Sequence, residues 1–198
     1  MSQINAHYLA AGKISLGQSL TSEGEKVGSV YPVAGKRYGE RLMCEYLDIL
    51  IPDSPAFDNV RYKWLVNPKT NQPLEIDRYY PKLKVGFEFQ GEQHFRQVEG
   101  MGDYKQIVYL DKLKKKLCKE QGVLLIHVKP IDLQAATMRK FAKKVSETVG
   151  VRKYRYDAKS FDVTKLHKLD CAATNYRQSL MERYPDSVGV YPAKRKGP

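Results

Sequence analysis

The stretch Leu74–Gln90, LEIDRYYPKLKVGFEFQ, decides how this sequence is expected to fold. Leu74–Tyr80 and Lys84–Phe89 are rich in apolar, aromatic and β-branched residues, which is typical of strands. Between them, Pro81-Lys82-Leu83 is short and opens with a proline, as tight turns often do. The sequence therefore predicts two neighbouring antiparallel strands.

Acidic side chains of these two strands are expected to lie on one face of the pair. Successive side chains of a strand point to opposite faces, so Glu88 and Gln90 share one face and the other is apolar: Val85, Phe87 and Phe89. The turn brings Asp77 of the preceding strand beside Glu88. Mg²⁺ prefers one or two carboxylates together with waters and phosphate oxygens. Asp77 and Glu88 are therefore the expected ligands of a divalent cation.

Apolar periodicity predicts further helices and strands on both sides of this pair. Tyr38–Leu50 predicts an amphipathic helix that ends before Pro52. The other expected elements are a strand at Tyr62–Val66, a loop at Asn67–Asn71, a helix at Asp103–Glu120, a strand at Val123–Val128, a helix starting near the capping residue Asp132, and a helix at Asp162–Tyr184. This order predicts an α/β protein with an α/β/α core around a mixed central sheet.

Three segments follow from the composition along the chain. Residues 1–36 are rich in Gly, Ser and Lys and predict an irregular arm, residues 37–150 form the core, and residues 151–198 form a basic, partly helical extension. Spacing alone leaves open whether the helix of the extension packs on the core, binds DNA or pairs two subunits.

The charge of the chain favours a polyanionic partner. Over 198 residues the formal net charge is +12, so nucleic acid is the first candidate and an anionic membrane surface the second. No apolar run approaches the ~20 residues that cross a bilayer, and the N-terminus lacks the pattern of a signal peptide. We therefore expect a soluble, cytoplasmic protein without a membrane partner. The three cysteines are widely spaced and favour neither a disulfide framework nor a zinc site: Cys44, Cys118 and Cys171.

Several blocks between Tyr62 and Val128 together resemble the core of the PD-(D/E)XK nuclease superfamily, which has the restriction-endonuclease-like fold. More narrowly, Phe87–Phe95, FEFQGEQHF, resembles the E-x-D-G-x-x-H signature of enzymes akin to the very-short-patch repair endonuclease and some phage-related homing endonucleases. Further along the chain, the helix and strand that follow in that group resemble three blocks here: Asp111–Lys114, Cys118 and Gly122–Ile126. The resemblance implies a Mg²⁺-dependent DNA endonuclease, with Mn²⁺ able to substitute, of bacterial or phage origin.

The resemblance also implies roles for residues around the two carboxylates. The backbone carbonyl of Phe89 would be a third metal ligand, and Glu40 resembles the glutamate on the family's first helix. Glu40 lies at the edge of the apolar arc of its helix, so it can reach the metal directly or through water; alternatively it is a first-turn acid favoured by the helix dipole. His94 matches the histidine of the narrower signature and suits proton transfer or a bond to the scissile phosphate, although a lone histidine is more often structural.

The family's usual lysine is replaced by Gln90, which carries no charge. An amide can orient the attacking water, but it cannot neutralise charge as an ammonium does. Lys114 is the candidate for the missing cation, because it falls near the centre of the inward arc of its helix and a carboxylate site beneath that helix would pair it. The alternative is that its stem crosses the core while its head reaches solvent.

Exposed cations are the candidates for contacts with DNA, either double-stranded or branched. They are Lys112, Lys116, Lys119, Arg152, Lys153 and Arg155. A symmetric dimer would suit cutting of both strands, but no self-complementary surface is visible in the sequence. Because of Gln90, a non-catalytic nucleic-acid-binding protein on a decayed nuclease scaffold is the alternative function, and a structure-selective RNA nuclease is a third.

Overall fold

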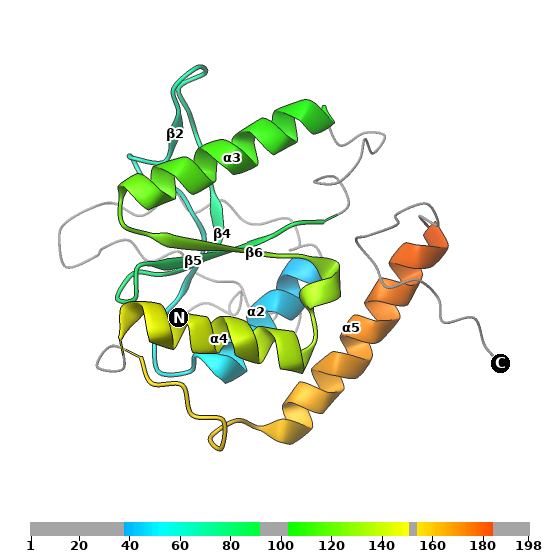
Figure 1. The fold of residues 1–198 in the computed structure, drawn as a ribbon. Coiled ribbons are helices and arrows are strands. Elements are labelled where there is room, and N and C mark those ends of the chain that lie inside the picture. The colour runs from blue at the N-terminus through cyan, green and yellow to red at the C-terminus, as the bar shows by residue number, and fades with distance from the viewer. Residues whose placement is uncertain (1–37, 92–102, 151–153, 184–198) are drawn as a thin grey trace, which may run out of the picture.

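The computed structural model of this chain describes residues 38–91, 103–150 and 154–183 (Figure 1). Within them, four strands form the main sheet in the order β1-β4-β5-β6, with bounds Phe57–Val60, Ile76–Tyr80, Val85–Phe89 and Leu124–Val128. β1, β4 and β5 are antiparallel neighbours, whereas β6 runs parallel to β5. The prediction of an α/β fold is therefore confirmed, and the sheet is mixed.

Helices cover both faces of this sheet (Figure 1). α2 (Tyr38–Leu50), α4 (Ala135–Val149) and α5 (Val163–Arg183) share one apolar core with the sheet, and we call it the main core. α3 (Tyr104–Glu120) packs on the other face over a second core. It also connects β5 to β6, because parallel neighbours need a crossover connection. The sheet is thus the middle of three layers.

The central strand β5 divides its side chains between these layers as its alternation predicts. All five of its residues are buried. Val85, Phe87 and Phe89 belong to the main core, whereas Gly86 faces Ile76 and Leu125. A β-carbon at Gly86 would lie 3.0 Å from a side-chain atom of each, so the absence of a side chain permits close packing there.

The predicted strand at Tyr62–Val66 is wrong. β1 lies earlier in the chain, and the Leu65 N–H donates to the Tyr62 carbonyl at 3.0 Å, which closes a turn. Tyr62 and Leu65 are apolar because both fill the second core from this turn. The short strands β2 (Val66–Asn67) and β3 (Gln72–Pro73) then form a hairpin before β4.

The helix predicted to start near Asp132 is present, but Asp132 is not its capping residue. Asp132 ends the short 3₁₀ helix η2 (Pro130–Asp132), and its carboxylate accepts from the Lys129 N–H at 2.9 Å. α4 begins only at Ala135, whose N–H donates to Asp170 of α5 at 2.6 Å. The first backbone N–H of α4 is therefore bonded by a residue from a distant part of the sequence.

α5 packs on the core, which is one of the three possibilities that spacing left open. Three of its inward residues are buried in the main core: Leu166, Leu169 and Ala173. The Tyr46 hydroxyl of α2 donates to Asp170 at 2.6 Å, and Arg177 donates to the Leu133 carbonyl before α4. α5 is thereby tied to both helices of its layer.

A buried cation, Arg78, joins β4 to the same layer. Its guanidinium donates to Asp48 of α2, and to Asp58 of β1 at 3.4 Å. It also donates to the Tyr80 hydroxyl at 3.2 Å. Because the Arg78 side chain is only 10% exposed, these partners replace most of its hydration.

Candidate metal and catalytic site

Asp77 and Glu88 occupy facing positions on β4 and β5. The register pairs Arg78 with Phe87, and one step further along it Asp77 lies opposite Glu88. Asp77 Oδ2 also accepts from the Phe89 N–H at 2.7 Å, which ties this carboxylate to the end of β5. The structure thus brings together the two carboxylates that the sequence singled out, on the face covered by α3.

Lys114 reaches this pair from α3. Its Nζ donates to Glu88 Oε2 and to the Glu75 carbonyl, the latter at 3.1 Å. The side chains of Lys114 and Glu88 are 14% and 5% exposed. The ammonium therefore lies beneath the helix against the carboxylate, as the helical spacing predicts, and the alternative in which its head reaches solvent is wrong. A catalytic role for Lys114 stays a prediction.

Burial dominates the electrostatics of the site. Desolvation and the neighbouring Asp77 raise the pKa of Glu88 above its usual range, and the Lys114 ammonium opposes this rise. Burial acts to lower the pKa of Lys114, but the charges of Glu88 and Asp77 outweigh it, so that this pKa is raised. Lys114 thus keeps its charge at neutral pH, and this single positive charge acts on both Glu88 and Asp77.

The two carboxylates fit the requirements of Mg²⁺. No three of the His, Cys, Asp and Glu side chains in residues 38–91, 103–150 and 154–183 form a metal-binding group. Mg²⁺ often uses only one or two carboxylates and keeps several waters. Glu88 Oε1 is buried and has no hydrogen-bond partner among the described residues. A buried carboxylate oxygen without a donor, beside a second carboxylate, fits a hard cation.

Gln90 is held by two residues whose roles the sequence did not indicate. Its Nε2 lies 3.3 Å from Asp111 Oδ2 and 2.7 Å from His127 Nδ1. Both amide hydrogens therefore have acceptors, which places the His127 ring proton on Nε2 and leaves Gln90 Oε1 as an acceptor. His127 is a neighbour because the parallel register pairs it with Glu88, two residues before Gln90.

α2 meets the end of β5 immediately before Glu40. A β-carbon on Gly39 would lie 2.3 Å from Phe89 Cζ and 2.8 Å from the Tyr176 hydroxyl, so no larger residue fits there without a shift. This contact brings the first turn of α2 to the strand end that carries Glu88. Glu40 is partly buried at this position. Its role as a ligand, and that of the Phe89 carbonyl, stay predictions.

Those predicted DNA contacts that lie among the described residues do not gather around the carboxylates. The exposed lysines of α3, which are Lys112, Lys116 and Lys119, project from the face opposite Lys114. Arg155 is exposed and follows Tyr154, whose hydroxyl donates to the Leu50 carbonyl at 2.6 Å. Leu50 ends α2, roughly 15 Å along the helix from Glu40. His94, Arg152 and Lys153 lie outside the described residues.

In the part of the chain that the structure describes, no helix is both long enough and apolar enough to cross a membrane.

Curated viral proteins are similar to part of this chain. The uncharacterized protein 307L of Invertebrate iridescent virus 6 is 34% identical over 107 residues, which are 48% of this chain and 54% of that protein. The uncharacterized protein 094L of Frog virus 3 is 36% identical over 77 residues, which are 36% of this chain and 50% of that protein. The uncharacterized protein 033L of Invertebrate iridescent virus 3 is 37% identical over 76 residues, which are 36% and 39%. The chain thus spans about half the length of these relatives or less. No family model and no solved structure matches it.

Proposed function

We propose that this chain is a Mg²⁺-dependent endonuclease of the PD-(D/E)XK type that hydrolyses phosphodiester bonds in DNA. The observation that carries the proposal is the buried contact of Lys114 with Glu88, opposite Asp77. An uncompensated lysine is almost never buried, so its place against two carboxylates supports a site for charge chemistry. The mixed sheet between helical layers and the net charge of +12 agree with a nuclease core and a DNA partner.

The residues present divide the work of phosphodiester hydrolysis. Asp77, Glu88, the Phe89 carbonyl and Glu40 would hold Mg²⁺ or Mn²⁺, which when bound lowers the pKa of a water and acts as a Lewis acid. Lys114 orients Glu88 and supplies positive charge near the phosphate. Gln90 cannot supply that charge.

Gln90 instead offers an acceptor. With its amide hydrogens directed at Asp111 and His127, its Oε1 would accept a hydrogen bond from the attacking water and so orient that water. In this arrangement two residues share the roles of the family's usual lysine. Lys114 on α3 supplies the positive charge, and Gln90 after β5 supplies a neutral hydrogen-bond acceptor.

Cleavage of supercoiled plasmid DNA tests the proposal. The native protein should nick or linearise the plasmid with Mg²⁺ or Mn²⁺ but not with EDTA, and Glu88→Gln should abolish cleavage. Glu120→Gln is the matched control, because it makes the same change at an exposed glutamate on the helix that carries Lys114. Equal cleavage by the native protein and Glu88→Gln would exclude this site.

The second candidate function is a non-catalytic nucleic-acid-binding protein on the same scaffold. The observation that favours it is that Gln90 uses its amide hydrogens within the protein and so donates none to a phosphate. Calorimetry separates the two functions, because the second predicts salt-sensitive DNA binding without Mg²⁺ binding. A symmetric dimer remains a proposal for cutting both strands, and gel filtration with light scattering tests it.

A further inference from the structure

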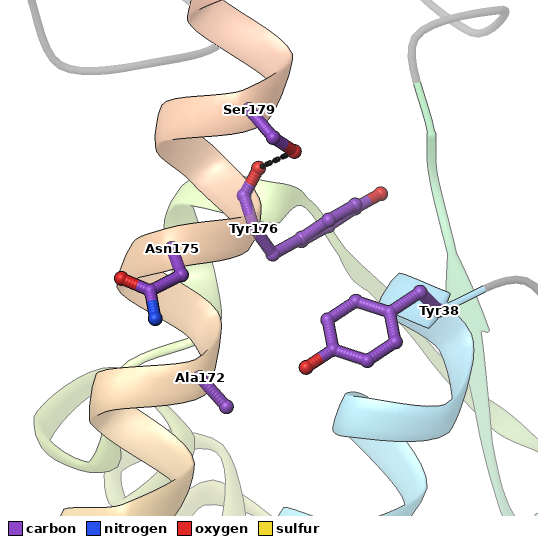
Figure 2. Close-up of a pocket in the computed structure, with 5 residues that line it drawn as sticks. All are labelled: Tyr38, Ala172, Asn175, Tyr176 and Ser179. Carbon is purple, nitrogen blue, oxygen red and sulfur yellow. Dashed lines mark hydrogen bonds between the residues drawn. The ribbon is translucent and has the colours of Figure 1, made fainter.

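A hollow of about 310 Å³ lies between the start of α2 and the middle of α5 (Figure 2). It is lined by Tyr38, Ala172, Asn175, Tyr176 and Ser179. Tyr38 projects from the first residue of α2, and the others come from one face of α5. This volume is at the lower end of the range of small-ligand pockets, so it suits a single ring system.

The hollow lies near the end of β5 that carries Glu88, on the α2 side of the sheet. The Tyr176 ring is 6.5 Å from the Phe89 ring, measured between centroids. Phe89 directly follows Glu88, and Gly39, where a β-carbon would meet the Phe89 ring and the Tyr176 hydroxyl, directly precedes Glu40. A nucleic acid whose backbone reached Glu88 would therefore pass close to this hollow.

The lining combines aromatic faces with an available amide. The Tyr38 and Tyr176 rings are 5.5 Å apart in an edge-on arrangement, and Tyr38 is 43% exposed. The Arg41 guanidinium lies 4.9 Å from the centroid of the Tyr38 ring, which places a cation at the rim. Ser179 donates to the Tyr176 carbonyl at 2.8 Å (Figure 2). Asn175 is exposed and lines the hollow, so its carboxamide can pair with the edge of a ligand.

We propose that this hollow receives one unpaired nucleobase of the DNA, and that the substrate carries such a base beside the bond that is cut. The inference rests on the proposed function for the identity of the polymer. An aromatic ring stacks on the face of any base, and an asparagine amide matches the donor and acceptor on a base edge. In a perfect duplex both faces of a base are already stacked. A bulge, mismatch or branch supplies an unpaired base at lower cost.

The charge of the rim favours this occupant over an apolar peptide. Arg41 would contact the phosphate that follows the bound base, and the net charge of +12 attracts the polymer as a whole. Because the hollow needs an unpaired base, a branched or interrupted DNA is expected to bind better than an uninterrupted duplex.

Two DNA duplexes of the same sequence test the proposal, one perfect and one with a single unpaired fluorescent adenine analogue. Binding is measured in EDTA, so that cleavage plays no part. The native protein should bind the bulged duplex roughly tenfold more tightly and quench its fluorescence. Tyr38→Ala and Asn175→Ala should each lose that preference while keeping their affinity for the perfect duplex.

Gln178→Ala is the matched control, because Gln178 is an exposed amide on α5 that pairs with Glu182 outside the hollow. Asn175 is itself exposed, so its variant should fold normally even if Tyr38→Ala does not. Equal affinity of the native protein for both duplexes, or retention of the preference in Asn175→Ala, would overturn the inference. Preferential binding of the bulge without any cleavage with Mg²⁺ would instead uphold this inference and contradict the nuclease.

Discussion

Removal of the Lys114 ammonium should destabilise the protein far more than removal of the Lys116 ammonium on the same helix. Lys114 and Glu88 are 14% and 5% exposed, so Lys114→Met leaves a carboxyl group buried without its cation. Breaking a buried ion pair from one side costs about 3–5 kcal/mol. The raised pKa of Glu88 lets it take up a proton, which offsets part of that cost. We expect the free energy of unfolding to fall by about 2–4 kcal/mol.

Urea unfolding followed by circular dichroism measures this loss. Lys116→Met is the control, because it makes the same change on the same helix but removes only a surface ion pair with Glu120. The side chains of Lys116 and Glu120 are 73% and 53% exposed. The cost of Lys116→Met should stay below about 1 kcal/mol. In the double variant Lys114→Met, Glu88→Gln the losses should be less than additive by at least about 1 kcal/mol. Equal losses for the two lysine variants, or strict additivity in the double variant, would refute the reasoning.

Three further predictions concern the site and the core. Asp77→Asn keeps an oxygen that can accept from Phe89, so it should fold normally and bind DNA while metal-dependent plasmid cleavage falls by at least ~100-fold; undiminished cleavage would contradict the ligand assignment. His127→Asn retains an acceptor where Nδ1 stands, whereas His127→Gln does not, so kcat should fall roughly tenfold only in the glutamine variant, and equal rates would show that Gln90 is not oriented this way. Burial raises the pKa of Tyr154 to about 12, so the stability it contributes is present below pH ~10 and is lost as pH rises through 12; in alkaline unfolding Tyr154→Phe should lose less stability across this window than the native protein.

The elements that the sequence predicted are those with strong local patterns. α2 has its predicted bounds, because a continuous apolar stripe and Pro52 mark both its inward face and its end. β4 and β5 were predicted because both are rich in apolar, aromatic and β-branched residues, and in β5 the alternation separates Glu88 from Phe87 and Phe89. Lys114 could be placed against a carboxylate because helical geometry alone puts it among inward residues.

The errors arose where tertiary contacts decide the conformation. β1, FDNV, has two polar residues in four, so it lacks the apolar pattern of a strand. Tyr62 and Leu65 are apolar because they fill the second core from a turn. The start of α4 depends on Asp170, which no local pattern links to Ala135. The partners of Gln90 come from α3 and β6, so no spacing near Gln90 reveals them.

The neighbours Asp77 and Arg78 carry opposite charges into opposite layers of the molecule. Asp77 lies with Glu88 and Lys114 beneath α3, and Arg78 lies with two acidic residues beneath α2. Sliding β4 by one residue would exchange these faces, placing a guanidinium against the Lys114 ammonium and a third carboxylate against Asp48 and Asp58. Misaligned pairing of this strand during folding is therefore penalised twice, by like charges on both sides of the sheet. Asp77 and Arg78 thus also specify the register of β4, the strand that carries Asp77 into the candidate site.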